Sequence, residues 1–231
     1  MTFFILTLFP EMFETITASS ILKRAREKKI IKIKLVNIRD FTKDKHKIVD
    51  DKPYGGGKGM ILKVDVLVNA LETIKPKPYT VLLSPSGKKY DQQKAVFFSR
   101  KKRLSIICGH YEGTDARIEK YVDEVISIGD FILTGGEIAA MAVVDSVARL
   151  IPDVIHPESL KSESFSLGSP REAWGNLEYP QYTRPANFRG LKIPKILLSG
   201  NHQQISDWRR KQAAKRTRKY RPDLIKIDKN K

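Results

Sequence analysis

Two glycine-rich stretches decide the fold of this chain. They read Cys108-Gly109-His110-Tyr111-Glu112-Gly113 and Ser127-Ile128-Gly129-Asp130-Phe131-Ile132-Leu133-Thr134-Gly135-Gly136-Glu137. Each follows a short run of mostly aliphatic residues, which is typical of a β-strand that ends in a loop. Glycine at such a position lets backbone amides and carbonyls come close to a ligand that a Cβ would exclude. The spacing alone fits two ordinary tight turns equally well.

Strand and helix patterns alternate around these two loops. Extended segments are predicted at 2–9, 31–35, 79–83, 104–108 and 125–128, a loop at 84–87, and helices at 64–74, 92–100 and 136–150. This alternation predicts an α/β fold, with a mainly parallel sheet covered by helices on both faces. Ligands bind beyond the carboxyl ends of the strands in such sheets. The loops after Leu83, Cys108 and Ile128 are therefore expected to surround one crevice.

Composition limits the class of protein. The 231 residues suit one large domain or two modest ones, and 41% hydrophobic residues indicate a folded chain. The formal net charge of +17 points to a polyanionic partner, and nucleic acid is favoured over a membrane because no long apolar span exists. The single cysteine, Cys108, excludes an internal disulfide and a thiolate zinc site, and it is consistent with a cytoplasmic location.

A second glycine cluster, at 55–59, lies in a segment from 39 to 60 with no periodic pattern. A segment of this length without a pattern is usually functional or disordered. One interpretation is a mobile lid with Tyr54 and Lys58 touching substrate, and a plain linker is the alternative. The cluster does not match a phosphate-binding P-loop, because Lys52 and Gly59 replace the required glycine and hydroxyl residue. No Gly-x-Gly-x-x-Gly follows the first strand either, which disfavours a nicotinamide-dependent enzyme.

The character of the chain changes after Pro152. Serine, glutamate and lysine dominate 158–169, which predicts a linker between two domains. From Asp207 to Lys231 there are eleven Lys or Arg residues against three Asp, an excess of eight positive charges. A basic helix over 208–221 that lies on phosphates is the favoured interpretation, and a solvated charged face is the alternative.

Several motifs together resemble the bacterial tRNA (guanine-N1)-methyltransferases across nearly the whole chain, in order. They are Leu8-Phe9-Pro10-Glu11-Met12-Phe13, Arg39-Asp40-Phe41-Thr42, Pro53-Tyr54-Gly55-Gly56-Gly57, Cys108-Gly109 with Tyr111-Glu112-Gly113, 127–137, and Tyr182-Thr183-Arg184-Pro185. The resemblance implies a knotted methyltransferase of the SPOUT superfamily. Its fold would be a parallel sheet with helices on both faces and a deep trefoil knot, followed by a small, mainly helical carboxy-terminal domain.

The same resemblance implies a domain plan and partners. Residues 1–158 would bind S-adenosylmethionine, 159–168 would form the linker, and 169–231 would bind tRNA. The protein would work as a homodimer in the cytoplasm, with no membrane attachment. Magnesium is implied by the family only, because the sequence contains no His or Cys cluster with ligand spacing.

The residues that would bind S-adenosylmethionine are carried over from the family's three loops. Adenine needs backbone donors and acceptors and a thin apolar slot, which aliphatic side chains and glycine amides supply. The implied residues are Leu83, Ser84, Pro85, Gly109, Tyr111, Glu112, Gly113, Ile128, Gly129, Asp130, Phe131, Ile132, Leu133, Gly135 and Gly136. His110 stands where relatives often carry arginine, and we assign it no role.

The implied reaction is methyl transfer to N1 of the guanosine just 3′ of the anticodon. Arg149 matches the family's arginine that stabilises guanine O6. The family's general base is an aspartate before Ser-Phe, and here Glu163 precedes Ser164-Phe165. We expect Glu163 to take the proton from N1, with Glu112 or Glu158 as the alternative acids.

The tRNA would be held by Tyr182, Arg184, His202, Trp208 and Arg209, together with the basic tail. A base extruded from the stem or loop would enter the crevice. Two other functions fit the same features. One is ribose 2′-O-methylation by an enzyme of the same superfamily, and the other is RNA binding without catalysis.

Overall fold

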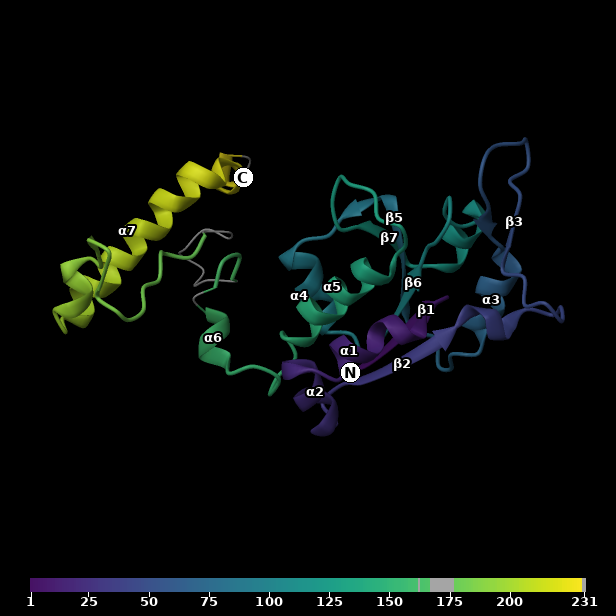
Figure 1. Ribbon diagram of the computed structural model, residues 1–231, viewed down its shortest axis with the longest axis horizontal. Coiled ribbons are helices and arrows are strands. Elements are labelled where there is room, and N and C mark those ends of the chain that lie inside the picture. The colour runs from purple at the N-terminus through teal and green to yellow at the C-terminus, as the bar shows by residue number, and fades with distance from the viewer. Residues whose placement is uncertain (162, 167–176, 230–231) are drawn as a thin grey trace. The chain divides into compact units, whose positions relative to one another are not determined.

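The computed structural model describes residues 1–161, 163–166 and 177–229 (Figure 1). It forms two compact units, Met1–Ile155 and His156–Lys231. The linker predicted over 159–168 begins within helix α6 (Pro157–Lys161), and part of it lies outside the described residues. The assignment of donor binding to residues 1–158 and of tRNA binding to residues 169–231 stays a prediction.

The first unit is built on a five-stranded sheet in which every pair of neighbouring strands is parallel. This confirms the parallel α/β architecture predicted from the alternating pattern. Strand β1 pairs with β2 on one side and β6 on the other, and β5 lies between β6 and β7. The strands in spatial order are β2 (Lys32–Asn37), β1 (Thr2–Thr7), β6 (Arg103–Cys108), β5 (Tyr79–Lys89) and β7 (Glu124–Ser127).

Helices cover both faces of the sheet, because successive side chains of the buried strands point to opposite sides. Phe3 and Ile5 of β1 belong to the core on one face, with α1 (Glu14–Thr17), α2 (Ser20–Glu27), α4 (Gln92–Ser99) and α5 (Glu137–Ala148). Phe4 and Leu6 belong to the core on the other face, with α3 (Val64–Glu72). Figure 1 shows α3 on the far side of the sheet from α4 and α5.

The loop predicted at 84–87 lies inside β5, so that prediction was wrong. Leu83 and Lys88 both pair with Ile126 of β7, and the residues between them bulge out of the ladder. Gly87 allows the chain to return, because a Cβ there would stand 2.5 Å from the backbone of Ile126. The Ser-Pro-Ser-Gly composition is typical of a turn, but here the bulge keeps the strand continuous.

Part of the segment from 39 to 60 has regular structure, although no periodic pattern marks it in the sequence. The 3-10 turns are Pro10–Phe13, Ile38–Phe41 and Ala116–Tyr121, and the second of them enters this segment. Strands β3 (Asp50–Asp51) and β4 (Ile61–Leu62) then close it as a short antiparallel pair. Tyr54, at its tip, is fully exposed.

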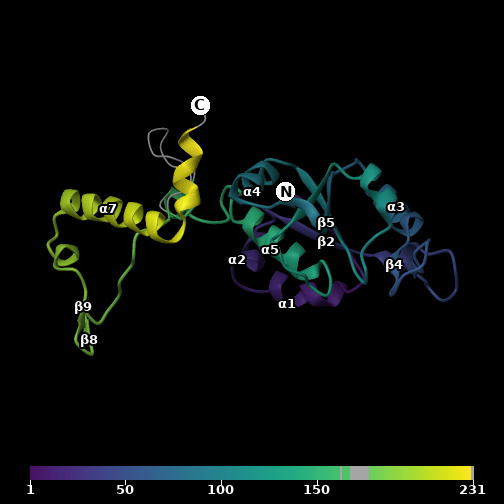
Figure 2. The ribbon, with the colours of Figure 1, turned by 90° about the horizontal axis from the view of Figure 1, so that it is seen from above.

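The second unit contains a small hairpin and one long helix. The hairpin pairs β8 (Asn187–Phe188) with β9 (Leu191–Lys192), as Figure 2 shows. Helix α7 (His202–Tyr220) covers the basic helix predicted over 208–221 except for Arg221, which follows its last residue. The side chain of Asn201 caps the helix by accepting a hydrogen bond from the Gln204 amide (3.0 Å). The 3-10 turns Lys195–Leu198 and Pro222–Lys229 flank the helix. No described helix is both long and apolar enough to cross a membrane.

Candidate functional site

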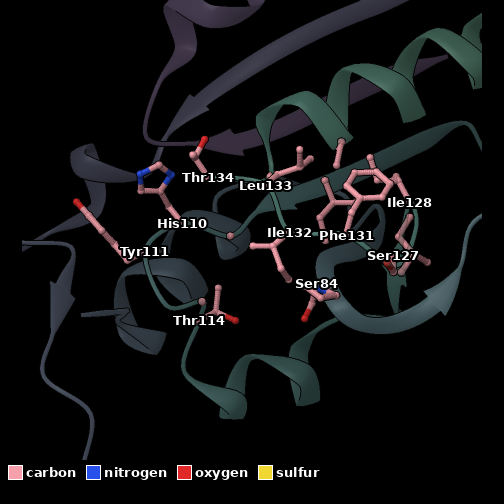
Figure 3. Close-up of a pocket in the computed structure, with 18 of the residues that line it drawn as sticks. Ser84, His110, Tyr111, Thr114, Ser127, Ile128, Phe131, Ile132, Leu133 and Thr134 are labelled. Carbon is pink, nitrogen blue, oxygen red and sulfur yellow. The ribbon is translucent and has the colours of Figure 1, made fainter. Parts of the chain in front are cut away.

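A cavity of about 440 Å³ lies at the carboxyl ends of β5, β6 and β7, where the three predicted loops meet (Figure 3). Its volume falls within the usual range of ligand pockets, about 300 to 1,000 Å³. The wall consists of Leu83, Ser84, Pro85, Gly109, His110, Tyr111, Glu112, Gly113, Thr114, Ile126, Ser127, Ile128, Gly129, Phe131, Ile132, Leu133, Thr134, Gly135, Gly136 and Ala139. It includes every residue predicted to bind the methyl donor except Asp130.

Asp130 lies outside the cavity wall. Its side chain is almost fully exposed, and its carboxylate lies 3.9 Å from the Lys89 Nζ. The backbone turns at this residue while its neighbours Gly129 and Phe131 face the cavity. The sequence prediction assigned every residue from 128 to 133 to donor binding, because the sequence does not show that Asp130 faces outward.

Glycines let two parts of the backbone pass each other at the base of the cavity. The Gly136 amide donates a hydrogen bond to the Gly109 carbonyl (2.7 Å), and His110 forms an antiparallel bridge with Gly135. A Cβ at Gly136 would stand 2.8 Å from the Cys108 Cα and 2.9 Å from the Gly109 nitrogen. Position 136 therefore requires glycine for this close approach, because the Cys108 Cα and the Gly109 nitrogen are backbone atoms that cannot move aside as a flexible side chain could.

One part of the wall is apolar and partly open to solvent. Ile128 and Leu133 pack against the core of the α5 face, whereas the Ile132 side chain is 80% exposed at the rim. Figure 3 shows Phe131 and Ile132 on the same side of the cavity as Ser84. This surface, beside glycine amides, has the character required by a flat heterocycle.

A polar group behind the opposite wall was missed in the sequence. Glu137, the first residue of α5, is only 2% exposed and accepts a hydrogen bond from the Thr7 hydroxyl (2.8 Å). Its Oε2 atom lies 4.0 Å from Nδ1 of His110. The His110 ring lies 5.0 Å from that of Phe9, between centroids. His110, to which we gave no role, thus lies between the cavity and a buried carboxylate without a hydrogen bond to it.

The rim of the cavity is tied to the segment that ends at β4. The Glu112 amide donates to the Met60 carbonyl (3.0 Å), and the Leu62 amide donates to the Gly113 carbonyl (3.0 Å). The Asp115 amide then donates to the Leu62 carbonyl (3.0 Å). These hydrogen bonds hold the 109–115 loop against the 50–62 segment.

Cys108 ends β6 directly below the cavity and is fully buried. Burial, and next the carboxylate of Glu137, raise the pKa of its thiol well above the ordinary value. In the unfolded chain the thiol loses its proton near pH 8.5, but in the folded chain it stays protonated.

The free energy of unfolding is therefore expected to fall as the pH rises above about 8.5, by up to about 1.4 kcal/mol per pH unit from this group. Urea unfolding at pH values from neutral to alkaline measures the slope. Cys108→Ala removes the thiol and should flatten the slope just above pH 8.5. Equal slopes for the two proteins would contradict the assignment.

The two predicted catalytic residues do not line this cavity. Arg149 caps the carboxyl end of α5, whereas Ala139, near the amino end, contacts the cavity. An α-helix rises about 1.5 Å per residue, which places Arg149 about 15 Å along the axis from Ala139. Glu163 belongs to the second unit, where its carbonyl accepts a hydrogen bond from the Ser166 amide (3.1 Å). Of the alternative acids, Glu112 lines the cavity and Glu158 lies in α6.

The residues predicted to bind tRNA lie in the second unit, several of them around α7. The rings of Tyr182 and Trp208 are 6.4 Å apart between centroids, and the Arg209 guanidinium lies 4.8 Å over the Tyr179 ring. His202 begins α7, and Arg184 is exposed. Helix α7 carries seven Lys or Arg residues against the single Asp207, which suits a phosphate backbone.

Metal-binding side chains do not gather anywhere in the described ranges 1–161, 163–166 and 177–229. No group of three or more His, Cys, Asp or Glu residues in this part of the chain could hold a metal ion.

Comparison with known proteins extends these observations over the whole chain. The sequence model of the family described as "tRNA (Guanine-1)-methyltransferase TrmD" matches residues 1–227. A tRNA (guanine-N(1)-)-methyltransferase of Carboxydothermus hydrogenoformans is 55% identical over 226 residues, covering 96% of this chain and 87% of the relative. Enzymes of the same name from Caldanaerobacter subterraneus and Mesomycoplasma hyopneumoniae are 53% and 51% identical. They cover 98% and 95% of this chain, and 92% and 93% of their own lengths.

Proposed function

This chain belongs to the tRNA (guanine-1)-methyltransferase family, and we propose that it methylates N1 of the guanosine just 3′ of the anticodon of tRNA. The methyl donor is S-adenosylmethionine, which supplies a methyl group activated by its sulfonium centre. The observation that carries the proposal is the cavity at the carboxyl edge of the sheet, together with the match of the family to residues 1–227. An enzyme of this kind acts on a cytoplasmic substrate, so we propose a cytoplasmic location.

The cavity fits the donor by its chemistry. The apolar side formed by Ile128, Phe131 and Leu133 can hold the adenine ring, and the bare backbone of Gly109 and Gly135 in the wall can approach the polar part. These residues exclude water from the donor and fix its orientation. Orientation alone lowers the barrier substantially, because the reacting atoms are held at the distance of attack.

The acceptor nitrogen must lose a proton before or during the methyl transfer. We propose that Glu163 removes the proton from N1 of guanine, and that Arg149 stabilises the negative charge that develops on O6. A positioned general base contributes about a hundred- to ten-thousand-fold to the rate. A guanidinium aimed at the developing charge adds electrostatic stabilisation where water is excluded.

We propose that two copies of the chain complete one site. Arg149 lies about 15 Å along α5 from the cavity of its own chain. A homodimer would allow Arg149 of one copy to serve the donor cavity of the other. Sedimentation at the assay concentration tests this, and a fully active monomer would refute it.

The deep trefoil knot of the family is also part of the proposal. Its support is the close passage of the backbone at Gly136 past Cys108 and Gly109, where a Cβ has no space. Knots are rare exceptions to the usual rules of chain connection. The glycine pair at 135–136 gives a physical reason why the chain can pass itself so closely at this point.

We propose that the second unit holds the tRNA. Tyr182, Arg184, His202, Trp208 and Arg209 supply rings and cations next to the basic helix α7. Residues 1–158, 159–168 and 169–231 would then act as the catalytic domain, the linker and the tRNA-binding domain. We propose that Mg²⁺, which the family resemblance implies, would act through the tRNA or through loose carboxylate contacts.

One experiment separates this proposal from its alternatives. The protein is incubated with labelled S-adenosylmethionine and unmodified tRNA that carries either guanosine or adenosine at the target position. We expect label only in the guanosine tRNA, and on N1 after nuclease digestion and mass spectrometry. A ribose 2′-O-methyltransferase would place the label on the sugar. A non-catalytic RNA-binding protein would transfer none and would bind no donor in calorimetry.

A further inference from the structure

A second group of cations lies at the edge of the sheet opposite the cavity. It is formed where the strands begin, and we call it the amino-edge cluster: Lys32, Lys75, Lys77, Lys101, Lys102 and Arg103. The strand register places Lys32 and Arg103 on either side of Thr2. Six residues of a β-strand span about 20 Å, so this cluster lies roughly that far from the donor cavity and belongs to another surface.

A shallow hollow of about 400 Å³ marks the centre of the cluster. Its wall contains Lys77, Pro78, Tyr79, Lys101, Lys102, Arg103 and Asp123. Asp123 is the one acid in this wall, and its carboxylate already accepts a hydrogen bond from the Thr80 amide (2.7 Å). The hollow therefore presents four cations against one carboxylate.

Two of the cations are held in place by aromatic rings. The Lys101 Nζ lies 4.1 Å from the centroid of the Phe97 ring. The Arg103 guanidinium lies 4.8 Å over Phe4, and its Nη2 donates to the Lys75 carbonyl (2.9 Å). Such contacts fix the position of a cation without neutralising it. An anionic ligand would therefore bind Lys101 and Arg103 at a smaller entropic cost, because these side chains are already held in place before it binds.

The cluster also lacks carboxylate partners. Within the part of the chain that the structure describes, Lys77, Lys101, Lys102 and Arg103 form no ion pair. By contrast Lys94, on neighbouring α4, lies 2.7 Å from Glu124. Neighbouring cations without counter-charges repel one another, and a bound polyanion would relieve this electrostatic repulsion.

We propose that the amino-edge cluster binds backbone phosphates of the substrate tRNA outside its anticodon loop. This inference rests on the proposed function and adds a contact on the first unit to those of α7. Phosphate contacts position an RNA without reading its sequence, which suits an enzyme that meets different tRNA bodies. A membrane surface fits less well, because Lys101 covers the exposed aromatic ring of Phe97 at this edge.

The test uses the full chain and two pairs of substitutions with the same change in net charge. Lys77→Gln with Lys102→Gln removes two cations of the cluster. Lys23→Gln with Lys47→Gln is the matched control, because these lysines already face Glu27 (3.9 Å) and Asp40 (3.1 Å). Binding of unmodified tRNA is measured over a series of salt concentrations.

We expect the cluster variant to raise Kd for tRNA on the order of tenfold. We also expect it to reduce the slope of log K against log salt by about two, because each lost phosphate contact removes about one counterion released. The control should stay within about twofold of the wild type. A minimal hairpin that keeps only the anticodon loop and its closing base pairs should bind both variants and the wild type equally.

Three results would overturn the inference. The cluster variant and the control could bind tRNA equally, the hairpin could lose as much affinity as the whole tRNA, or the cluster variant could keep its tRNA affinity and lose binding to phosphatidylglycerol vesicles. Methyl transfer at saturating tRNA is measured in parallel. A wild-type protein that binds tRNA but never methylates it would refute the proposed function, whereas the binding data would still decide the role of the cluster.

Discussion

Replacing Glu163 with glutamine is expected to slow single-turnover methyl transfer by about a hundred- to ten-thousand-fold, because the amide cannot accept the proton of guanine N1. Glutamine keeps the size of the side chain and one acceptor oxygen, so the affinity for tRNA should stay within a few-fold of the wild type. The rate is measured with enzyme in excess over tRNA and labelled S-adenosylmethionine. This design separates the chemical step from product release.

Two control variants make this result specific. Glu112→Gln changes the carboxylate in the cavity wall, and Glu158→Gln changes the one in α6. Neither should reduce the chemical rate as strongly as Glu163→Gln. If Glu163→Gln reacts within a few-fold of the wild type while one of the other two is slow, the general base is the other acid. Glu163→Asp, which restores the carboxylate, should recover part of the rate.

Replacing Gly136 with alanine is expected to abolish measurable binding of S-adenosylmethionine. The new methyl group would stand 2.8 Å from the Cys108 Cα and 2.9 Å from the Gly109 nitrogen, so the two backbones must separate. That movement shifts the base of the cavity and breaks the Gly136–Gly109 hydrogen bond. Overpacking of this kind costs about 1 to 3 kcal/mol of folding stability. Calorimetry with the donor and thermal unfolding measure the two effects.

Gly109→Ala is the matched control for this substitution. A Cβ at Gly109 meets the Leu83 carbonyl oxygen at 3.4 Å, which is an ordinary contact, and this glycine also lines the cavity. The control should therefore fold with nearly unchanged stability, and its donor affinity should fall less than that of Gly136→Ala. Donor affinity of Gly136→Ala equal to that of the wild type would show that the close passage does not shape the cavity. Circular dichroism confirms that each variant is folded before the affinities are compared.

The centre of the sheet was predictable because β1 and β6 are buried on both faces. Phe3–Leu6 is wholly apolar and Leu104–Ile107 is apolar except for Ser105, and alternation with helices then predicts parallel strands. The bulge at 84–87 was not predictable, because its residues are typical of a turn. Its return to the ladder depends on the backbone of Ile126, about forty residues later in the sequence.

The sequence predicted the loops that line the candidate site, but it did not predict the buried polar residues behind the cavity wall. Glycines at strand ends mark the cavity wall, and the comparisons confirm the family that the motifs indicated. The group formed by Thr7, His110 and Glu137 is different, because Thr7 and Glu137 are 130 positions apart in the sequence. Local patterns cannot show that such residues meet. The roles of Arg149 and Glu163 rest on the resemblance, and both stay predictions.

Three backbone hydrogen bonds, which tie Glu112, Gly113 and Asp115 to Met60 and Leu62, couple the movement of the cavity rim to that of the 50–62 segment. A ligand that displaced this segment would therefore change the shape of the cavity. For any such ligand, thermodynamic reciprocity requires that it and the occupant of the cavity change each other's affinity by the same factor.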